Sequence, residues 1–416
     1  TILPCAFVAV EGGKITWVGD RRPVGFFDEL IDAEGGILLP GLINCHAHTA
    51  MTAMRGYGDG HDLQDWLHNY IFPVEARWDE QAIRACTTLG LAEMIASGTT
   101  CIADMYMFTG AVAQEVAAAG ISANLCCGGV LFDPVFDPKT CHDCVQQEAL
   151  SQQWHGYNGG QILFDASIHA EYTSRPELWK WTADFAKANG LGMHVHVSET
   201  KKEHEDCIAK YGKTPLQILD QYGVWDVRAI AAHCVWTTPE DWAVMAEKGI
   251  SPVHNPVSNL KLGSGIAPMP AMKKAGVNVA LGTDGVSSNN NLDMVEEMKF
   301  AAILHNGAGC DPLALLAPDA LRMATVNGAK ALGRNTGRIA VDCDADLILL
   351  DSGRLNLIPC HNPVSNLAYA AHGGDVRMNM ARGKVIYKDG DFLTIDIARV
   401  KREVAEYAVP LLFGGN

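Results

Sequence analysis

The strongest constraint on the fold of this chain is a repeated alternation of strand-like and helix-like segments. Eight short apolar runs lie near residues 39–45, 99–105, 121–128, 162–169, 192–198, 229–234, 250–255 and 277–284. Helix-like stretches follow them, most clearly at 80–97, 110–119, 176–189, 239–248 and 293–304. Eight β/α units over roughly 300 residues are typical of a (β/α)8 TIM barrel, a fold of ~250 residues plus insertions. A doubly wound open sheet would also alternate, but no GxGxxG motif follows the first strand.

Strand patterns at both ends of the chain predict a second, smaller domain. Residues 6–19 alternate around Glu11-Gly12-Gly13 as a β-hairpin does, and strand patterns return at 346–350 and 376–387. The expected fold is therefore α/β, a barrel with a small composite β-sandwich. The expected domains are the β-sandwich from residues 1–37 and 340–395, the metal-dependent barrel from 38–339, and a C-terminal helix and tail from 396–416.

Histidine and aspartate residues occupy the C-terminal ends of the predicted barrel strands, where barrel enzymes build their active sites. His46 and His48 end the first strand, and residues two apart in a strand point to the same side. Later strands end in HVHVSET (194–200), HC (233–234), HN (254–255) and TD (283–284). Burying these polar side chains is costly unless they are paired. A shared metal ion would remove that cost.

The available donors indicate which metal to expect. Three imidazoles and one carboxylate suit Zn²⁺ or Fe²⁺, with one position left for a water whose pKa the metal lowers to ~7. The fourth strand, which ends at His169, carries no lysine that could bridge two ions. We therefore expect one divalent ion, with zinc as the first choice and iron as the alternative.

Composition restricts the partners. With 32 Lys and Arg against 48 Asp and Glu, the net charge is −16, which disfavours nucleic acid and anionic membranes and favours a small-molecule substrate. No run approaches the ~18 apolar residues of a membrane span. The first residues, Thr1–Pro4, lack a signal-peptide pattern, which predicts a cytoplasmic protein. The thirteen cysteines are then expected to be reduced, and the Cys141/Cys144 pair to be structural.

Five motifs together resemble the amidohydrolase superfamily: PGLINCHAH, HVHVSET, AAHC, HNPVSNLKLGSGIAP and LGTDGVSSNN. Within it the chain is similar to the branch of 5-methylthioadenosine/S-adenosylhomocysteine deaminases. The similarity extends from about Gly36 to Leu332, and the flanking strands fit the β-domain of that branch. The resemblance implies deamination of an adenine nucleoside (5′-methylthioadenosine, adenosine or S-adenosylhomocysteine type), in which hydroxide formed at the metal attacks C6 and ammonia leaves. Barrels of this kind often pair, so a homo-oligomer is compatible with it.

The resemblance also assigns roles to residues. It implies the metal ligands His46, His48, His196 and Asp284. Spacing alone leaves His194 as a competing ligand, but the ligand histidine of the family precedes its glutamate by three residues, which selects His196. Catalytic roles fall to Glu199 as proton shuttle, Asp284 as holder of the nucleophile and proton carrier to ammonia, and His233 as hydrogen-bond partner of the attacking water.

Three residues match substrate contacts of the resembling deaminases: Trp66 against the base, Glu75 at the ribose hydroxyls, and His169. The structural alternatives are a surface-helix glutamate and a core histidine. His254 and Asn255 are expected to brace the end of the seventh strand. Members that accept S-adenosylhomocysteine are expected to carry Arg in the strand 3–4 loop, but here Lys139 is the only Lys or Arg between Arg84 and Arg175. We therefore expect a thioether or small apolar 5′ group to be preferred.

Two other functions remain as alternatives. The first is deamination of a free base or another aminated heterocycle, such as guanine, 8-oxoguanine, cytosine or an s-triazine; a ribose contact at Glu75 argues against it. The second is a metal-binding barrel without catalysis, which the presence of every ligand and of Glu199 disfavours.

Overall fold

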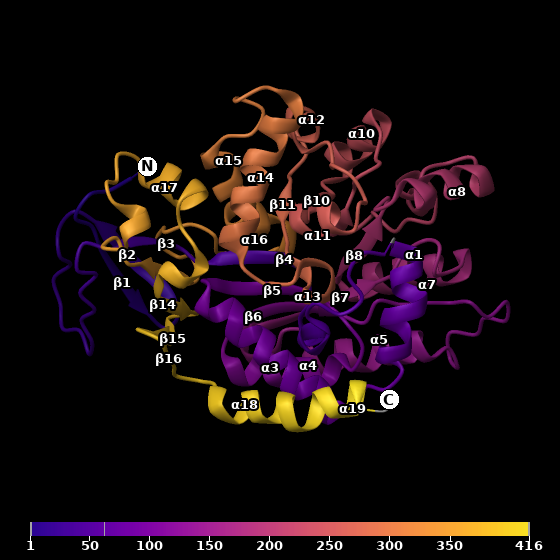
Figure 1. The fold of residues 1–416 in the computed structure, drawn as a ribbon, viewed down its shortest axis with the longest axis horizontal. Helices are drawn as coiled ribbons and strands as arrows, with labels where there is room; N and C mark the ends of the chain where they lie inside the picture. Colours follow the sequence, from indigo (N-terminus) through magenta and orange to yellow (C-terminus); the bar gives the residue numbers. More distant parts are fainter. Residues whose placement is uncertain (1, 62, 415–416) are drawn as a thin grey trace.

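A computed structural model describes residues 2–61 and 63–414, and it confirms the expected barrel with an additional β-domain (Figure 1). Thr1 and residues 415–416, which belong to the predicted terminal segments, lie outside the described residues. The barrel sheet has the strand order β11-β10-β9-β8-β7-β6-β5-β4-β12. Its strands are β4 (Leu42–His48), β5 (Thr99–Met105), β6 (Ser122–Cys126), β7 (Ile162–Ser167), β8 (Gly192–Val197), β9 (Ala229–His233), β10 (Ser251–His254), β11 (Ala280–Leu281) and β12 (Asp284–Gly285).

The eighth barrel strand is split, and its two halves join the edges of the sheet. β11 pairs with β10, whereas β12 pairs with β4 and places Asp284 opposite Ala47. Gly282 lies at the split, where a Cβ atom would come within 2.8 Å of the His46 backbone nitrogen. The glycine therefore permits the close approach that puts Asp284 beside the histidines of β4.

The first barrel strand begins later than the expected range of 39–45. β3 (Ile37–Pro40) pairs with β13 (Leu347–Leu350) in the small domain, and β4 begins at Leu42. Gly41 separates the two strands, and a Cβ atom there would lie 2.1 Å from Thr100 Oγ1. The chain thus passes from the small sheet into the barrel at this glycine.

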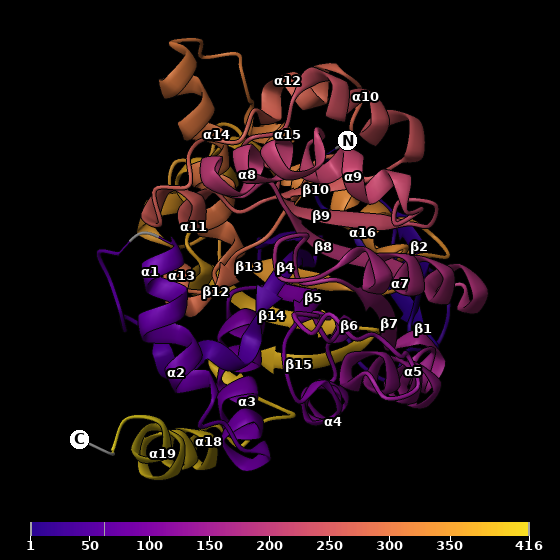
Figure 2. The ribbon, with the colours of Figure 1, turned by 90° about the vertical axis from the view of Figure 1, so that its right-hand side faces the viewer.

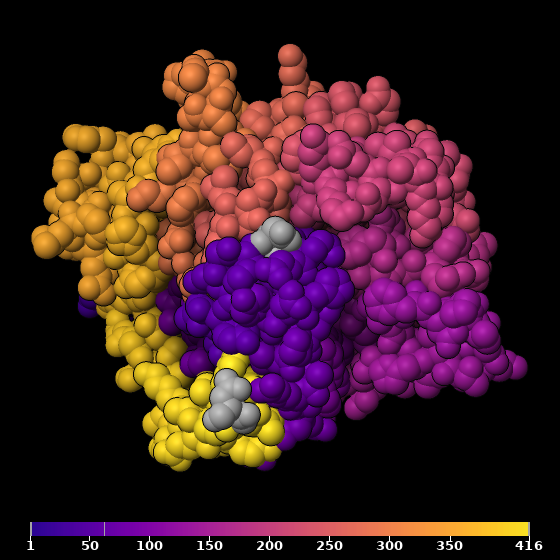
Figure 3. All heavy atoms as spheres, turned by 45° about the vertical axis from the view of Figure 1, so that its right-hand side comes forward, coloured from indigo at the N-terminus to yellow at the C-terminus, as the bar shows by residue number. Residues whose placement is uncertain are grey.

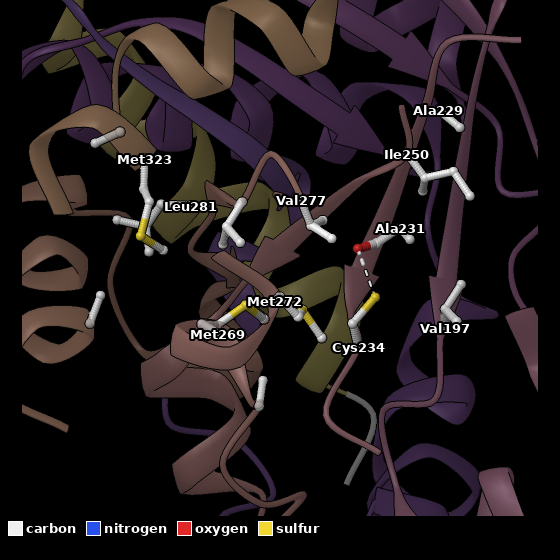
Figure 4. Close-up of a cluster of buried hydrophobic side chains, with 14 of the residues drawn as sticks. Val197, Ala229, Ala231, Cys234, Ile250, Met269, Met272, Val277, Leu281 and Met323 are labelled. Carbon is white, nitrogen blue, oxygen red and sulfur yellow. Dashed lines mark hydrogen bonds between the residues drawn. The ribbon is translucent and has the colours of Figure 1, made fainter. Parts of the chain in front are cut away.

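Helices cover the outer face of the barrel sheet (Figures 1 and 2). In Figure 4, Met269, Met272 and Val277 pack near Cys234, whose thiol donates to the Ala231 carbonyl at 3.4 Å.

None of the helices among the described residues is long and apolar enough to cross a membrane. The helices of the barrel and its loops are α1 (Leu63–Asp65), α2 (Phe72–Glu75), α3 (Glu80–Ala96), α4 (Thr109–Ala119), α5 (His142–Trp154), α6 (Tyr157–Gly160), α7 (Pro176–Asn189), α8 (Lys201–Tyr211), α9 (Pro215–Gln221), α10 (Pro239–Lys248), α11 (Pro256–Lys261), α12 (Met269–Lys274), α13 (Val286–Asn289), α14 (Met294–Gly309), α15 (Ala317–Met323) and α16 (Val326–Leu332), with a 3-10 helix at Thr49–Met54 and a π-helix, η2, at Trp66–Ile71.

The small β-domain combines both ends of the chain. The hairpin of β1 (Phe7–Glu11) and β2 (Lys14–Gly19) packs on a five-stranded sheet of order β16-β15-β14-β13-β3, through a cluster that includes Ile15, Leu347 and Met378. Its remaining elements are β14 (Val376–Ala381), β15 (Lys384–Lys388), β16 (Asp391–Phe392) and α17 (Pro363–Tyr369). The limit of 37/38 expected from the sequence falls inside β3, so we propose that the small domain extends to Pro40, with 339/340 as the second limit.

The C-terminal segment consists of α18 (Ile397–Glu403), a π-helix at Val404–Ala408 and α19 (Val409–Phe413). It lies against α2 and α3 (Figure 2), and Figure 3 shows it in yellow beside the indigo surface of the segment that follows β4. Arg77 donates to the Leu412 carbonyl at 2.6 Å, and the Tyr407 hydroxyl bonds the carboxylate of Asp79. Residues 397–413 are therefore helical, and we propose them as the C-terminal helix expected from the sequence.

The thirteen cysteines are all free. Cys144 is buried against Leu131 and Leu178, as a packing residue would be. The structure therefore gives the Cys141/Cys144 pair no disulfide.

Candidate metal centre and active site

Three histidine rings converge at the C-terminal end of the barrel, and the Nδ1 atom of each ring contacts a neighbouring residue. The Nδ1 atom of His46 lies 2.9 Å from His194 Nε2, that of His48 bonds the Met105 carbonyl, and that of His196 lies 2.7 Å from the His169 carbonyl oxygen. These contacts fix the ring orientations and leave each Nε2 atom directed toward the others. Ligand atoms of His46, His48 and His196 lie within 4.8 Å of one another.

Asp284 supplies a carboxylate to the same point. Its Oδ1 atom lies 3.2 Å from the Nε2 atoms of both His46 and His48, and its Oδ2 atom accepts hydrogen bonds from Ser258 and Ser288, each at 2.7 Å. One oxygen is thus held by two hydroxyls while the other faces the imidazoles. His46, His233 and Asp284 form a second group with ligand atoms within 4.8 Å of one another.

The donor set fits a divalent cation. His46 Nε2 is fully buried and makes no hydrogen bond of suitable geometry among the described residues, although Asp284 Oδ1 lies 3.2 Å away. Burial lowers the pKa of His46 to about 3 and that of His196 well below its ordinary value, so both rings are neutral, as metal binding requires. For His48, burial acts in the same direction, but the Asp284 carboxylate outweighs it and raises the pKa to about 9. The cluster therefore favours a positive charge at its centre, which a metal ion satisfies.

Glu199 and His233 lie next to this cluster. Glu199 is 7% exposed and receives a 3.4 Å hydrogen bond from Ser264 Oγ, while its Oε2 atom lies 3.7 Å from His233 Nε2. Burial raises the pKa of Glu199, which suits a group that accepts and returns a proton near neutrality. The other ring nitrogen of His233 lies 2.9 Å from Asn259 Oδ1, so the Nε2 side of this ring faces the glutamate.

Glu75 reaches the site through a tyrosine. The Tyr106 hydroxyl donates to Glu75 Oε1 at 2.7 Å, and the Tyr106 ring centroid lies 6.0 Å from that of His48. His169 is likewise adjacent, its ring centroid 4.7 Å from that of His196. Trp66 is buried in an apolar cluster at the start of η2. No hydrogen bond or ring contact between Trp66 and the histidines is present among the described residues.

Several residues around the site carry no obvious signal in the sequence. Ser258 and Ser288 lie within the HNPVSN and VSSNN motifs, but nothing in those motifs indicates that both hydroxyls meet Asp284. Tyr106 follows β5 without any distinguishing pattern. His194 lies behind His46, 3.5 Å from the Cys126 thiol, and does not face the other Nε2 atoms. His254 contacts His305 at 3.2 Å, and Asn255 lies 3.3 Å from His233 Nδ1, consistent with bracing roles.

Comparison with known proteins places this geometry in a family. Residues 37–386 match the Amidohydrolase family. The chain is 41% identical to a 5-methylthioadenosine/S-adenosylhomocysteine deaminase of Acetivibrio thermocellus over 99% of its own length and 96% of that protein. It is 41% identical to a 5′-deoxyadenosine deaminase of Methanosarcina mazei over 97% of this chain and 93% of the relative.

A solved structure is similar over nearly the whole chain. The zinc-bound adenosine deaminase from Xanthomonas campestris superposes with a TM-score of 0.89 at 32% identity, covering 99% of this chain and 94% of that one. The match over residues 37–386 and the near-complete alignments together show that the chain belongs to the metal-dependent amidohydrolase family.

Proposed function

We propose that the protein is a hydrolytic deaminase of adenine nucleosides that replaces the C6 amino group with oxygen and releases ammonia. The observation that carries this proposal is the buried convergence of three Nε2 atoms and Asp284 Oδ1, with Glu199 at its edge. The relatives at 41% identity support the reaction class, because both are named as deaminases of adenosine derivatives.

We assign the metal to His46, His48, His196 and Asp284, with zinc as the expected ion at one per chain. The zinc-bound relative supports this choice. Bound there, a divalent cation supplies Lewis-acid activation of a water molecule at neutral pH. His233 is within reach of the same point and is assigned to hydrogen-bond the attacking water through Nε2.

Glu199 is assigned as the proton shuttle. With its pKa raised by burial, its carboxylate accepts a proton from the attacking water and its acid form donates that proton to a ring nitrogen. The Asp284 carboxylate, oriented by Ser258 and Ser288, is assigned to pass a proton to the departing ammonia. Each step uses a group that is already held in position by a neighbour, which lowers the cost of reaching the transition state.

The substrate-contacting roles rest on placement around the cluster. Glu75 Oε1 is occupied by Tyr106, so Oε2 is the atom assigned to vicinal ribose hydroxyls. His169 is assigned to a substrate contact beside His196, and Trp66 to the base. The lack of Lys or Arg other than Lys139 between residues 84 and 175 supports a small or apolar 5′ group. Cytoplasmic location and homo-oligomer formation remain predictions from the sequence.

A substrate panel tests the proposal. Purified zinc-loaded protein is offered 5′-deoxyadenosine, 5′-methylthioadenosine, adenosine, S-adenosylhomocysteine, adenine, guanine, cytosine and an s-triazine, and ammonia release is measured. We expect turnover of the nucleosides and its loss in Glu199→Gln with the zinc content unchanged. Exclusive turnover of free bases or triazines, or no ammonia from any compound, would contradict the proposal.

A further inference from the structure

The proton shuttle Glu199 lies on an unusual turn between β8 and α8. Ser198, immediately before it, has φ = +49°, in the left-handed region that residues other than glycine rarely adopt. Ser198 is also fully buried. Such a conformation persists only where the surroundings hold it in place.

The side-chain carboxyl group of Glu203 accepts hydrogen bonds from the backbone of this turn. Glu203, on the first turn of α8, accepts a hydrogen bond at Oε1 from the Ser198 backbone N–H and at Oε2 from that of Glu199, both at 2.7 Å. A weaker contact of 3.4 Å joins the Thr200 N–H to Oε2. Glu203 is 5% exposed, so these amide hydrogen bonds are shielded from water.

These bonds exceed what capping of α8 requires. In a capping box, the acidic residue at the third helical position returns a bond to the N-cap amide, here that of Thr200. That contact is the longest of the three, whereas the short bonds go to the two amides upstream. The box of α10 provides the contrast, because Asp241 bonds its N-cap amide at Thr238 at 2.9 Å.

We propose that Glu203 is a positioning residue for catalysis, which fixes the Ser198–Glu199 peptide so that the Glu199 carboxyl stays between Ser264 and His233. This inference rests on the proposed role of Glu199 as the shuttle. Other contacts of Ser198 also hold this turn in place. Its carbonyl accepts a hydrogen bond from the Trp236 N–H at 3.0 Å, and its hydroxyl lies 3.1 Å from His204 Nδ1.

Without the Glu203 carboxylate, the turn would be free to relax toward negative φ. That movement would carry the shuttle away from the reacting atoms. A displacement of ~1 Å at a catalytic group can reduce the rate by ~100-fold.

The test is Glu203→Gln in the full-length, zinc-loaded protein. The amide keeps the size and one acceptor, but it replaces the other oxygen with an NH₂ group that faces a backbone N–H. We expect kcat to fall by ~10–100-fold with KM within ~3-fold and zinc content unchanged. Amide exchange followed by mass spectrometry is expected to be faster for the peptide that covers Ser198 and Glu199.

Two further variants separate positioning from helix stability. Asp241→Asn makes the same chemical change at a buried capping residue that contacts no proposed catalytic group, so it should lower Tm while leaving kcat within ~2-fold. Glu203→Asp keeps both carboxylate oxygens but shortens the side chain by one methylene, so its kcat should lie between those of Glu203→Gln and wild type. This variant also provides the test if Glu203→Gln folds poorly.

A double variant shows whether Glu203 acts through Glu199. If it does, Glu199→Gln/Glu203→Gln loses no more kcat than Glu199→Gln alone, because there is then no shuttle left to position. Native kcat or unchanged exchange in Glu203→Gln would overturn the inference, as would full additivity in the double variant. If the wild-type protein deaminates nothing, the proposed function fails, while the exchange comparison still decides whether Glu203 holds the turn.

Discussion

Glu75 offers a quantitative test of nucleoside recognition. Its Oε1 atom is held by Tyr106 at 2.7 Å, and burial raises the pKa of Glu75, so the group is partly desolvated before substrate arrives. Hydrogen bonds from two ribose hydroxyls to a carboxylate are worth ~1.5–3 kcal/mol each. Taking the lower value for both gives ~3 kcal/mol, or a factor of ~100 in kcat/KM. Glu75→Gln is therefore expected to reduce kcat/KM on adenosine-type nucleosides by about that factor.

The assay pairs this change with a change in the substrate. Kinetics are measured for wild type and Glu75→Gln on 5′-methylthioadenosine and on its 2′,3′-dideoxy analogue. Removing the hydroxyls should cost the wild type ~100-fold but the variant little, since the interaction is already lost. Glu80→Gln, an exposed glutamate that pairs with Arg84, is the matched control and should behave as wild type. If the dideoxy analogue loses the same factor in Glu75→Gln as in wild type, Glu75 does not bind the hydroxyls.

Three further predictions concern the metal, the 5′ group and pH. Removal of metal with a chelator should abolish deamination and lower Tm, because it leaves the buried His46 Nε2 unpartnered; one equivalent of zinc should restore both, and full activity of metal-free protein would refute the assignment. On the 5′ side, kcat/KM for S-adenosylhomocysteine should be at least ~10-fold below that for 5′-methylthioadenosine, since a charged tail finds only Lys139 in the stretch from 85 to 174; equal or higher values would exclude this preference. Burial raises the pKa of Glu171 from 4.5 to about 8, so the folded state binds this proton more tightly than the unfolded chain and stability declines as pH rises from about 4.5 through about 8. Glu171→Gln should therefore raise Tm over wild type at pH 9 but not at pH 4, and an equal shift at both values would contradict the linkage.

The sequence predicts the barrel well because the fold depends on patterns that are local and repeated. The strands β5 to β10 begin and end within about three residues of their expected limits, since each is a short, largely apolar run followed by turn or helix residues. The first barrel strand begins later than its expected limit because the chain passes from the small sheet into the barrel sheet at Gly41. That break depends on the contact with Thr100, which the local sequence does not reveal.

The residues of the candidate site likewise include some that the sequence predicts and some that it does not. Strand alternation and the family motifs bring His46, His48 and His196 into one group, and the structure places them together. The surrounding contacts depend on backbone conformations that hydrophobic patterns do not encode. His233 and Asp284, for example, have φ values of +70° and +64°, and these turns decide which neighbours their side chains meet.

The contact between the C-terminal segment and the loop around Glu75 has a consequence for how the chain is made. Asp79 and its partner Tyr407 are 328 residues apart, and Arg77 and Leu412 are 335 apart. At a synthesis rate of ~5–20 residues per second, on the order of 20–60 s pass between the emergence of the two sides. During that time the face of α3 that the last helices cover is exposed on the nascent chain. This contact therefore forms only after synthesis has passed residue 412, and a chain that stopped before residue 397 would carry the proposed metal ligands without the segment that covers their neighbouring loop.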